Sequence, residues 1–177
     1  FRSLPFIPGK LTLPNVKQET ASVGSEDLQK NLRKVLPFSA TSEGKRNLFG
    51  VLVEVQETGL RTVASDGFRL GYADTAAVVM KEESIMIPLQ YAKLLQGILK
   101  LVPEGEVSIR ADKSAVKIQS EYFELVFPRP DFDFPDYKRI LPSGFKANLE
   151  VNREELLEAV NRSLGTDKVR LTREGEV

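Results

Sequence analysis

The 177 residues of the sequence include no cysteine and no histidine. These absences exclude thiol nucleophiles, imidazole bases, serine–histidine triads and the usual zinc sites. They also exclude disulfide bonds, which fits a reducing cytoplasm. An enzyme built on this chain would have to use carboxylates, lysine, serine, threonine or tyrosine. We therefore predict a protein that is not an enzyme, with no catalytic residue, no metal site and no cofactor.

Long apolar runs and an excess of either charge are also lacking. A membrane-spanning helix needs about 20 apolar residues, and runs such as Ala76–Met80 are far shorter, so we predict no membrane segment. Lysine and arginine number 25 and so do aspartate and glutamate, which argues weakly against a nucleic-acid binder with a uniformly basic surface. What matters is therefore where the charges lie.

What the sequence does contain is a regular series of amphipathic helices. Apolar positions at helical spacing predict helices over Ser25–Leu36 and Pro88–Val102, with the serine as N-cap of the first and the proline as the first residue of the second. A third helix is expected from Asn152, which forms a capping-box-like start with Glu155. The three helix starts are 63 and 64 residues apart, which indicates an internal repeat.

The strands follow the same repeat. Alternating apolar residues predict one strand before each helix and three after each of the first two, over Glu19–Val23, Leu48–Val55, Leu60–Ser65, Phe68–Asp74, Ser84–Ile87, Val107–Ala111, Ala115–Gln119, Phe123–Phe127 and Lys146–Val151. Asp66-Gly67 is typical of a tight hairpin turn with positive φ. We therefore predict an α+β fold of repeated β-α-β-β-β units with antiparallel sheets. Residues 16–147 would form one domain, 148–177 would begin another, and 1–15 would be a linker.

Basic side chains are concentrated on the polar faces of the first two helices. Beyond its acidic first turn, the first helix carries Lys30, Arg33 and Lys34, and the second carries Lys93 and Lys100. Most such stripes are simply solvated. Two equivalent helices that are both basic, in a chain of zero net charge, favour contact with the phosphates of a nucleic acid, independent of base sequence.

Two other functions are alternatives to nucleic-acid contact. Asp131, Asp133 and Asp136 could hold a cation through oxygen ligands, which would make the chain a carboxylate- or metal-dependent enzyme. Their spacing fits no calcium loop, and prolines interrupt the segment, so a polar loop is the better interpretation. The remaining alternative is a protein-interaction scaffold without any role at DNA.

Two segments carry a resemblance to a known family. Arg61–Leu70 and Phe134–Pro142, in this order and inside this repeat, resemble the two most recognisable motifs of the bacterial sliding clamp, the beta subunit of DNA polymerase III. The similarity extends through Arg162. The resemblance implies a cytoplasmic processivity factor of DNA replication that forms a head-to-tail homodimer ring. Each subunit would have three similar domains, with helices facing the channel for duplex DNA and sheets outside.

The resemblance also implies the parts of the ring that this chain holds. Residues 1–15 would link an absent first domain to the middle domain, 16–147, and 148–177 would begin the third. After Arg162 only Ser163–Lys168 precede the strand-like Val169–Leu171, several residues fewer than the family has. Facing the DNA would be the helix cations together with two residues of a rim loop, namely Lys30, Arg33, Lys34, Lys45, Arg46, Lys93 and Lys100.

An outer pocket between the second and third domains is implied as well. It would receive short linear peptides from the replicative polymerase, the clamp loader and repair proteins. Its wall in this chain would comprise Leu48, Ser65, Gly67, Phe68, Arg69, Leu70, Pro135, Arg139 and Ile140. The family often has histidine or tyrosine where Phe68 stands, so the aromatic contact is kept while the hydrogen bond is lost.

Overall fold

A computed structural model describes residues 14–102, 104–144 and 150–163 of the chain. They fall into two compact units, the first ending at Tyr137 and the second beginning at Lys138. Residues 1–13 of the predicted linker, the predicted boundary between 147 and 148, most of the strand predicted over Lys146–Val151 and everything after Ser163 lie outside the described residues. No helix in the described ranges is long and apolar enough to cross a membrane.

Two helices lie side by side in the first unit. Helix α1 (Ser25–Val35) buries Leu28, Leu32 and Val35 completely, because residues three and four apart share one face of a helix. Helix α2 (Leu89–Leu99) buries one stripe in the same way. A short 3-10 helix, η1 (Leu36–Phe38), follows α1 and contains the proline that ends it.

Both predicted helix starts are wrong in detail. Gly24 is the N-cap of α1, and Ser25 is buried because its backbone N–H donates to the oxygen of Gly105 at 2.8 Å. The N–H of Gly105 in turn donates to the hydroxyl of Ser25 at 3.2 Å. Pro88 is the N-cap of α2 and also the last residue of the preceding strand, so that strand passes into the helix without a loop.

The strands of the first unit form two antiparallel sheets, ordered β5-β1-β7-β8-β9 and β4-β3-β2-β6. Their bounds are β1 Glu19–Gly24, β2 Gly50–Gln56, β3 Gly59–Ser65, β4 Leu70–Thr75, β5 Val78–Val79, β6 Glu83–Pro88, β7 Glu106–Ala111, β8 Ala115–Gln119 and β9 Glu124–Pro128. The predicted α+β class and the order β-α-β-β-β are confirmed, because β1-α1-β2-β3-β4 is followed by the equivalent series β6-α2-β7-β8-β9.

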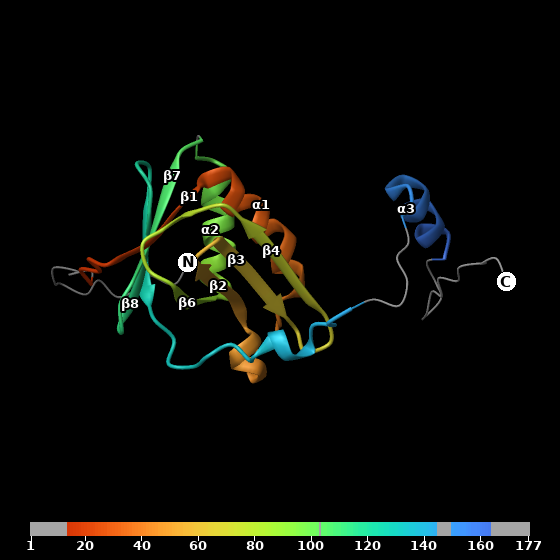
Figure 1. The fold of residues 1–177 in the computed structure, drawn as a ribbon, viewed down its shortest axis with the longest axis horizontal. Coiled ribbons are helices and arrows are strands. Elements are labelled where there is room, and N and C mark those ends of the chain that lie inside the picture. The colour runs from red at the N-terminus through yellow and green to blue at the C-terminus, as the bar shows by residue number, and fades with distance from the viewer. Residues whose placement is uncertain (1–13, 103, 145–149, 164–177) are drawn as a thin grey trace, which may run out of the picture. The chain divides into compact units, whose positions relative to one another are not determined.

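Each repeat contributes its first strand to the sheet of the other repeat. Strand β1 pairs with β7, and β6 pairs with β2, so neither sheet is complete without both repeats. One core joins the two sheets and the two helices, with fully buried members such as Val51, Ile85 and Ile118. Figure 1 shows α1 and α2 alongside the sheets of this unit. The exchange of strands explains why two repeats make one folded domain.

Three local predictions about the strands need correction. Leu48 ends a 3-10 helix, η2 (Glu43–Leu48), and β2 begins only at Gly50. The predicted two-residue turn at Asp66-Gly67 is a four-residue loop, and in it only Gly67 has positive φ, at 90°. Strand β5 was not predicted, because two residues carry no periodic signal.

The second unit contains little regular structure among its described residues. A 3-10 helix, η3 (Tyr137–Ile140), begins at the last residue of the first unit. Helix α3 (Arg153–Arg162) has the predicted N-cap, since the side-chain oxygen of Asn152 accepts from the backbone N–H groups of Glu154 at 2.8 Å and Glu155 at 3.3 Å. The expected start of a third helix is therefore confirmed.

Candidate functional site

The exposed faces of α1 and α2 share a cationic hollow. Arg33 from α1 and Lys93 from α2 line it together with Gln96. Both cations are exposed, and neither has an ion-pair partner among the residues that the structure describes. The two positive charges thus stand on either side of one depression, where a phosphate group between the helices would meet both.

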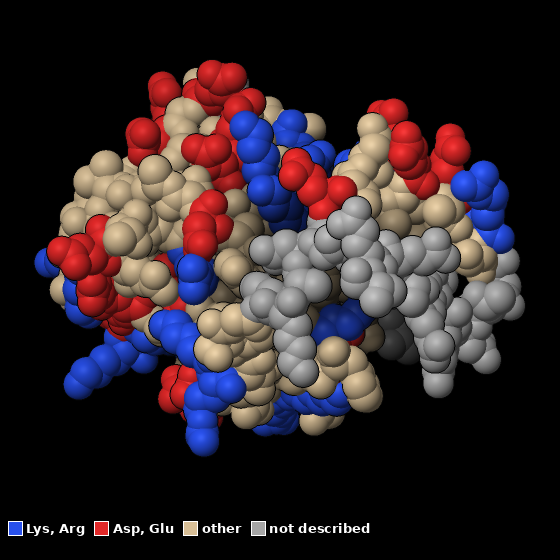
Figure 2. Space-filling model, turned by 45° about the vertical axis from the view of Figure 1, so that its right-hand side comes forward, with Lys and Arg blue, Asp and Glu red and all other residues tan. Residues whose placement is uncertain are grey.

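A second hollow lies between the same helices and has mixed charge. Lys30 and Lys100 line it beside Glu26 and Glu104. The Lys30 ammonium donates to the Glu26 carboxylate at 2.8 Å, and this hydrogen bond raises the pKa of Lys30. Glu26 therefore partly balances the positive charge of Lys30, and the sequence pattern did not indicate this ion pair. On the face drawn in Figure 2, basic side chains gather in groups beside the acidic ones.

The remaining predicted DNA-facing residues are divided between two environments. Lys34 is exposed on α1. In η2, the Lys45 ammonium donates to the backbone oxygen of Asp66 at 2.7 Å and lies 4.7 Å from the ring centroid of Phe68. Arg46, one residue further, lines a separate cleft at the start of α2. Lys45 is thus engaged with the loop between β3 and β4.

That loop, Asp66–Arg69, is held by its own hydrogen bonds. The Asp66 carboxylate accepts from the backbone N–H groups of Arg69 at 2.8 Å and Phe68 at 2.9 Å, and from the Arg69 guanidinium at 3.0 and 3.1 Å. These bonds, the one from the Arg69 backbone first, lower the pKa of Asp66 to about 2. The Ser65 hydroxyl donates to the oxygen of Arg69 at 2.8 Å. The loop is therefore a preformed element.

An aromatic side chain projects from this fixed loop into solvent. Phe68 is 91% exposed, although it is large and apolar. Leu48 lies beside Gly67, because a Cβ on that glycine would stand 3.6 Å from the Leu48 side chain. A single exposed apolar side chain is common on protein surfaces, so the case for an interaction site rests on its place beside the other predicted pocket residues. The structure therefore brings six predicted pocket residues to one loop and its base, namely Leu48, Ser65, Gly67, Phe68, Arg69 and Leu70.

Sequence reasoning missed a residue under this loop. The Arg69 guanidinium lies 5.7 Å from the ring centroid of Phe38. A Cβ on Gly71 would come within 2.5 Å of that same ring, so only glycine allows the ring to lie there. Phe38 directly follows the proline in the short helix after α1, and no local signal in the sequence connects it with Arg69.

The segment that follows β9 is anchored to strand β2 through Tyr137. Tyr137 is only 4% exposed, and its hydroxyl donates to the carboxylate of Glu54 on β2. Pro135, two residues earlier, is exposed in the first unit. Arg139 and Ile140 belong to the second unit, and Ile140 is 71% exposed there. These three are the predicted pocket residues outside the β3–β4 loop and its base.

The metal-site alternative finds no support in the arrangement of side chains. Asp131, Asp133 and Asp136 are all exposed. Across the described ranges, no group of three or more aspartate and glutamate side chains is arranged to hold a metal ion. The polar-loop interpretation of this segment therefore remains the better one.

Comparison with known proteins identifies the family. The family model for the central domain of the DNA polymerase III beta subunit matches residues 22–136. The beta sliding clamp of Vibrio cholerae is 30% identical over 95% of this chain and 47% of its own length. The chain thus spans about half the length of the curated relatives that it matches.

Solved structures agree with the family model. The DNA polymerase III beta subunit of Thermotoga maritima has a TM-score of 0.80 and 34% identity, covering 88% of this chain and 42% of that one. A sliding clamp from Bartonella birtlesii bound to griselimycin has a TM-score of 0.75 and 27% identity, covering 93% of this chain and 46% of that one. By fold, by sequence and by the match over residues 22–136, this chain belongs to the DNA polymerase III beta subunit family of bacterial sliding clamps.

Proposed function

We propose that this chain supplies the middle of a ring-shaped processivity factor of bacterial DNA replication. The observation that carries the proposal is the cationic hollow between α1 and α2, where Arg33 and Lys93 stand without acidic partners among the described residues. The two helices are equivalent members of the two repeats. Family membership supports the same function.

The DNA face would act through phosphates and be indifferent to base sequence. Cations on both helices would provide a weak electrostatic contact that lets the duplex move past them. Retention on DNA would come from topology, because a closed ring cannot leave a duplex sideways. Little direct affinity is then needed, which agrees with the small number of unpaired cations in the hollow. Such a protein works without catalysis.

The β3–β4 loop would form half of a groove for short linear peptides. Its fixed backbone presents Phe68 as an apolar contact and Arg69 as a hydrogen-bond donor, and Leu48 at the end of η2 adds a second apolar contact beside Gly67. The resemblance adds Arg139 and Ile140, which belong to the second unit, to the proposed peptide-binding residues. Peptides from the replicative polymerase, the clamp loader and repair proteins would dock there, and this contact would tether the polymerase to DNA.

The domain assignment follows from the same proposal. Residues 16–147 would be the middle domain of a three-domain subunit, with 1–15 as the linker before it and 148–177 as the beginning of the third. Two such subunits would close head to tail into a homodimer ring in the cytoplasm. Neither a metal-dependent enzyme nor a scaffold without DNA is favoured by any observation above.

A matched pair of double variants tests the DNA face. Arg33→Glu with Lys93→Glu should weaken binding to a blunt duplex by roughly tenfold at low salt and reduce the salt dependence by about two phosphate contacts. The control is Lys17→Glu with Lys113→Glu, which changes net charge equally at two other exposed positions. Fluorescence anisotropy at several salt concentrations measures both. Equal losses in the two pairs would contradict the assignment of this face.

A further inference from the structure

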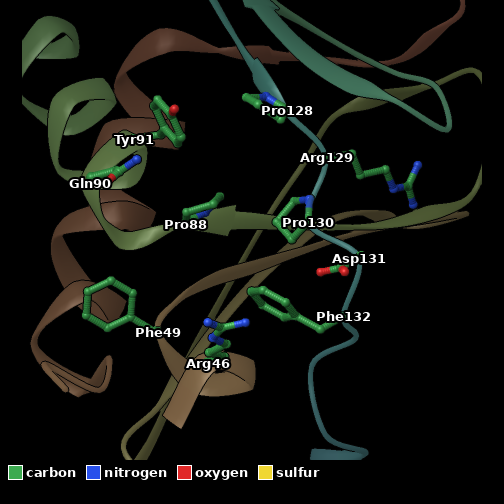
Figure 3. A pocket seen from close by; sticks show the side chains of 10 residues that line it. All are labelled: Arg46, Phe49, Pro88, Gln90, Tyr91, Pro128, Arg129, Pro130, Asp131 and Phe132. Carbon is green, nitrogen blue, oxygen red and sulfur yellow. The ribbon is translucent and has the colours of Figure 1, made fainter. Parts of the chain in front are cut away.

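A cleft at the beginning of α2 combines Arg46, one of the predicted DNA-facing residues, with side chains that the proposed function does not use. It has a volume of about 420 Å³, within the range of small-ligand sites. Figure 3 shows its walls: Gln90 and Tyr91 on the helix, Arg46 in η2 and Phe49 just after it, and Asp131 and Phe132 on the segment that follows β9. Three aromatic rings therefore surround one space that also holds a cation, an amide and a carboxylate.

The walls of this cleft are held in place by contacts outside it. The Tyr91 ring stacks on the buried ring of Phe127, with centroids 4.7 Å apart and planes 14° from parallel. Arg129 pairs with Glu83 and donates to the backbone oxygens of Asp112 and Ser84, both at 3.0 Å. These bonds fix the chain just before Asp131. The walls at Tyr91 and Arg129 are therefore preformed, and a ligand would lose little binding energy in ordering them.

The side chains in the cleft match the two ends of a nucleotide. Arg46 has no ion-pair partner among the residues that the structure describes, so its guanidinium is available to a phosphate. Phe49, Tyr91 and Phe132 offer ring surfaces on which a base can stack. Asp131 and Gln90 can hydrogen-bond to the edge of that base. A purely apolar ligand would leave these three polar groups unused.

We propose that this cleft binds one unpaired nucleotide of a DNA strand. The site continues the cationic face, because Gln90 in the cleft and Lys93 in the hollow are three residues apart and so neighbours on one side of α2. The inference rests on the proposed function to that extent. Arg46, in η2 just before β2, would supply the cation for the phosphate of that nucleotide. Continuity and the free guanidinium favour a nucleotide over a peptide segment.

The test compares DNA with and without a single-stranded end. The 177-residue chain is titrated with a blunt duplex, with the same duplex carrying a short single-stranded overhang, and with the single strand alone. We expect the overhang to bind more tightly, and Phe132→Ala to remove at least about fivefold of that advantage, as loss of one stacked base does. Arg46→Gln should reduce the same advantage. Leu101→Ala removes an apolar side chain that is 87% exposed outside the cleft, and it should change nothing.

The outcomes separate this inference from the proposed function. Arg33→Glu with Lys93→Glu should weaken the blunt and overhang duplexes alike and keep their ratio. If the Arg33→Glu and Lys93→Glu double variant binds as wild type does, the proposed DNA face is wrong. The affinity of the Phe132→Ala variant for the single strand still tests the cleft in that case. If overhang and single-strand binding survive both Phe132→Ala and Arg46→Gln in folded protein, verified by circular dichroism, the cleft does not bind a nucleotide, which overturns the inference.

Discussion

At the scale of single residues, Tyr137 fixes the end of the first unit. Burial first, and then its hydrogen bond to Glu54, raise the pKa of Tyr137 to about 12. Arg61 on β3 donates to both carboxylate oxygens of Asp74 on β4, at 2.6 and 2.9 Å, and this hydrogen bond raises the pKa of Arg61 and lowers that of Asp74. Tyr137 is thus anchored on a charged network across three strands. The predicted pocket residues Arg139 and Ile140 follow Tyr137 after Lys138.

The raised pKa of Tyr137 predicts a loss of stability in base. Its contribution to the free energy of unfolding is fully present below the unfolded-state pKa of about 10 and is lost as the pH rises through about 12. Wild type should therefore lose stability relative to Tyr137→Phe between these values. Denaturant titrations of both proteins at pH 9 and pH 11 measure the difference, and ultraviolet absorbance should show one late-ionising tyrosine that the variant lacks. A constant difference would contradict the assignment.

Single residues also show where sequence reasoning stops. The contact between Tyr137 and Glu54 joins positions 83 residues apart, and nothing in a proline-bounded aromatic loop indicates which strand will receive it. Likewise, nothing in the sequence around Phe38 indicates its contact with Arg69. The assignment of Leu48, Phe68 and Arg69 to one peptide pocket is a prediction from the resemblance to a family, and the hydrogen bonds that fix the β3–β4 loop are visible only in the structure.

At the scale of elements, helix and strand periodicity predicted almost every element with boundaries within a few residues. Two of the errors lie where two elements join without a loop. Pro88 is favoured at the first position of a helix, yet it still pairs with Gly50 as the end of β6. Ser25 is a good N-cap by type, but a backbone partner at Gly105 draws it inside. In both places, backbone contacts between the two repeats override the preference of the residue type for its position at a helix start.

The β3–β4 loop supports a prediction about the peptide groove. A chimera in which residues 16–147 replace the matching part of the Bartonella birtlesii clamp would supply the rest of the groove. We expect griselimycin, which is bound to the Bartonella birtlesii clamp, to occupy this groove in the chimera. Phe68→Ala should then lower its affinity by at least about fivefold, because hot-spot aromatics contribute over 1 kcal/mol. Calorimetric titration measures the affinity.

The matching control keeps folding and binding apart. Phe68 is almost fully exposed, so its removal should leave the free energy of unfolding unchanged within about 0.5 kcal/mol. Tyr122→Ala removes another exposed aromatic, away from the loop on the turn between β8 and β9. If Tyr122→Ala and Phe68→Ala bind griselimycin equally well, the loop is not part of the groove.

At the scale of the whole molecule, the exchange of β1 and β6 between repeats makes one rigid support for two equivalent helices. Helices α1, α2 and α3 start 64 residues apart, so the repeat continues into the second unit. A ring of such repeats would place a basic helix pair at regular intervals around a channel, which is what a sequence-independent sliding contact requires. The chain would contribute one such pair and half of one groove.

Retention of the chimera on DNA tests this account most directly. After loading by the clamp loader of the host species, the chimeric dimer should remain on a nicked circular plasmid at moderate salt. Cutting the plasmid once should release it, because a ring slides off a free end. The half-lives on the two DNA forms are compared by gel filtration of the labelled protein. A chimera that forms the dimer yet leaves circular and linear DNA at the same rate would contradict the claim that this chain is part of a sliding clamp.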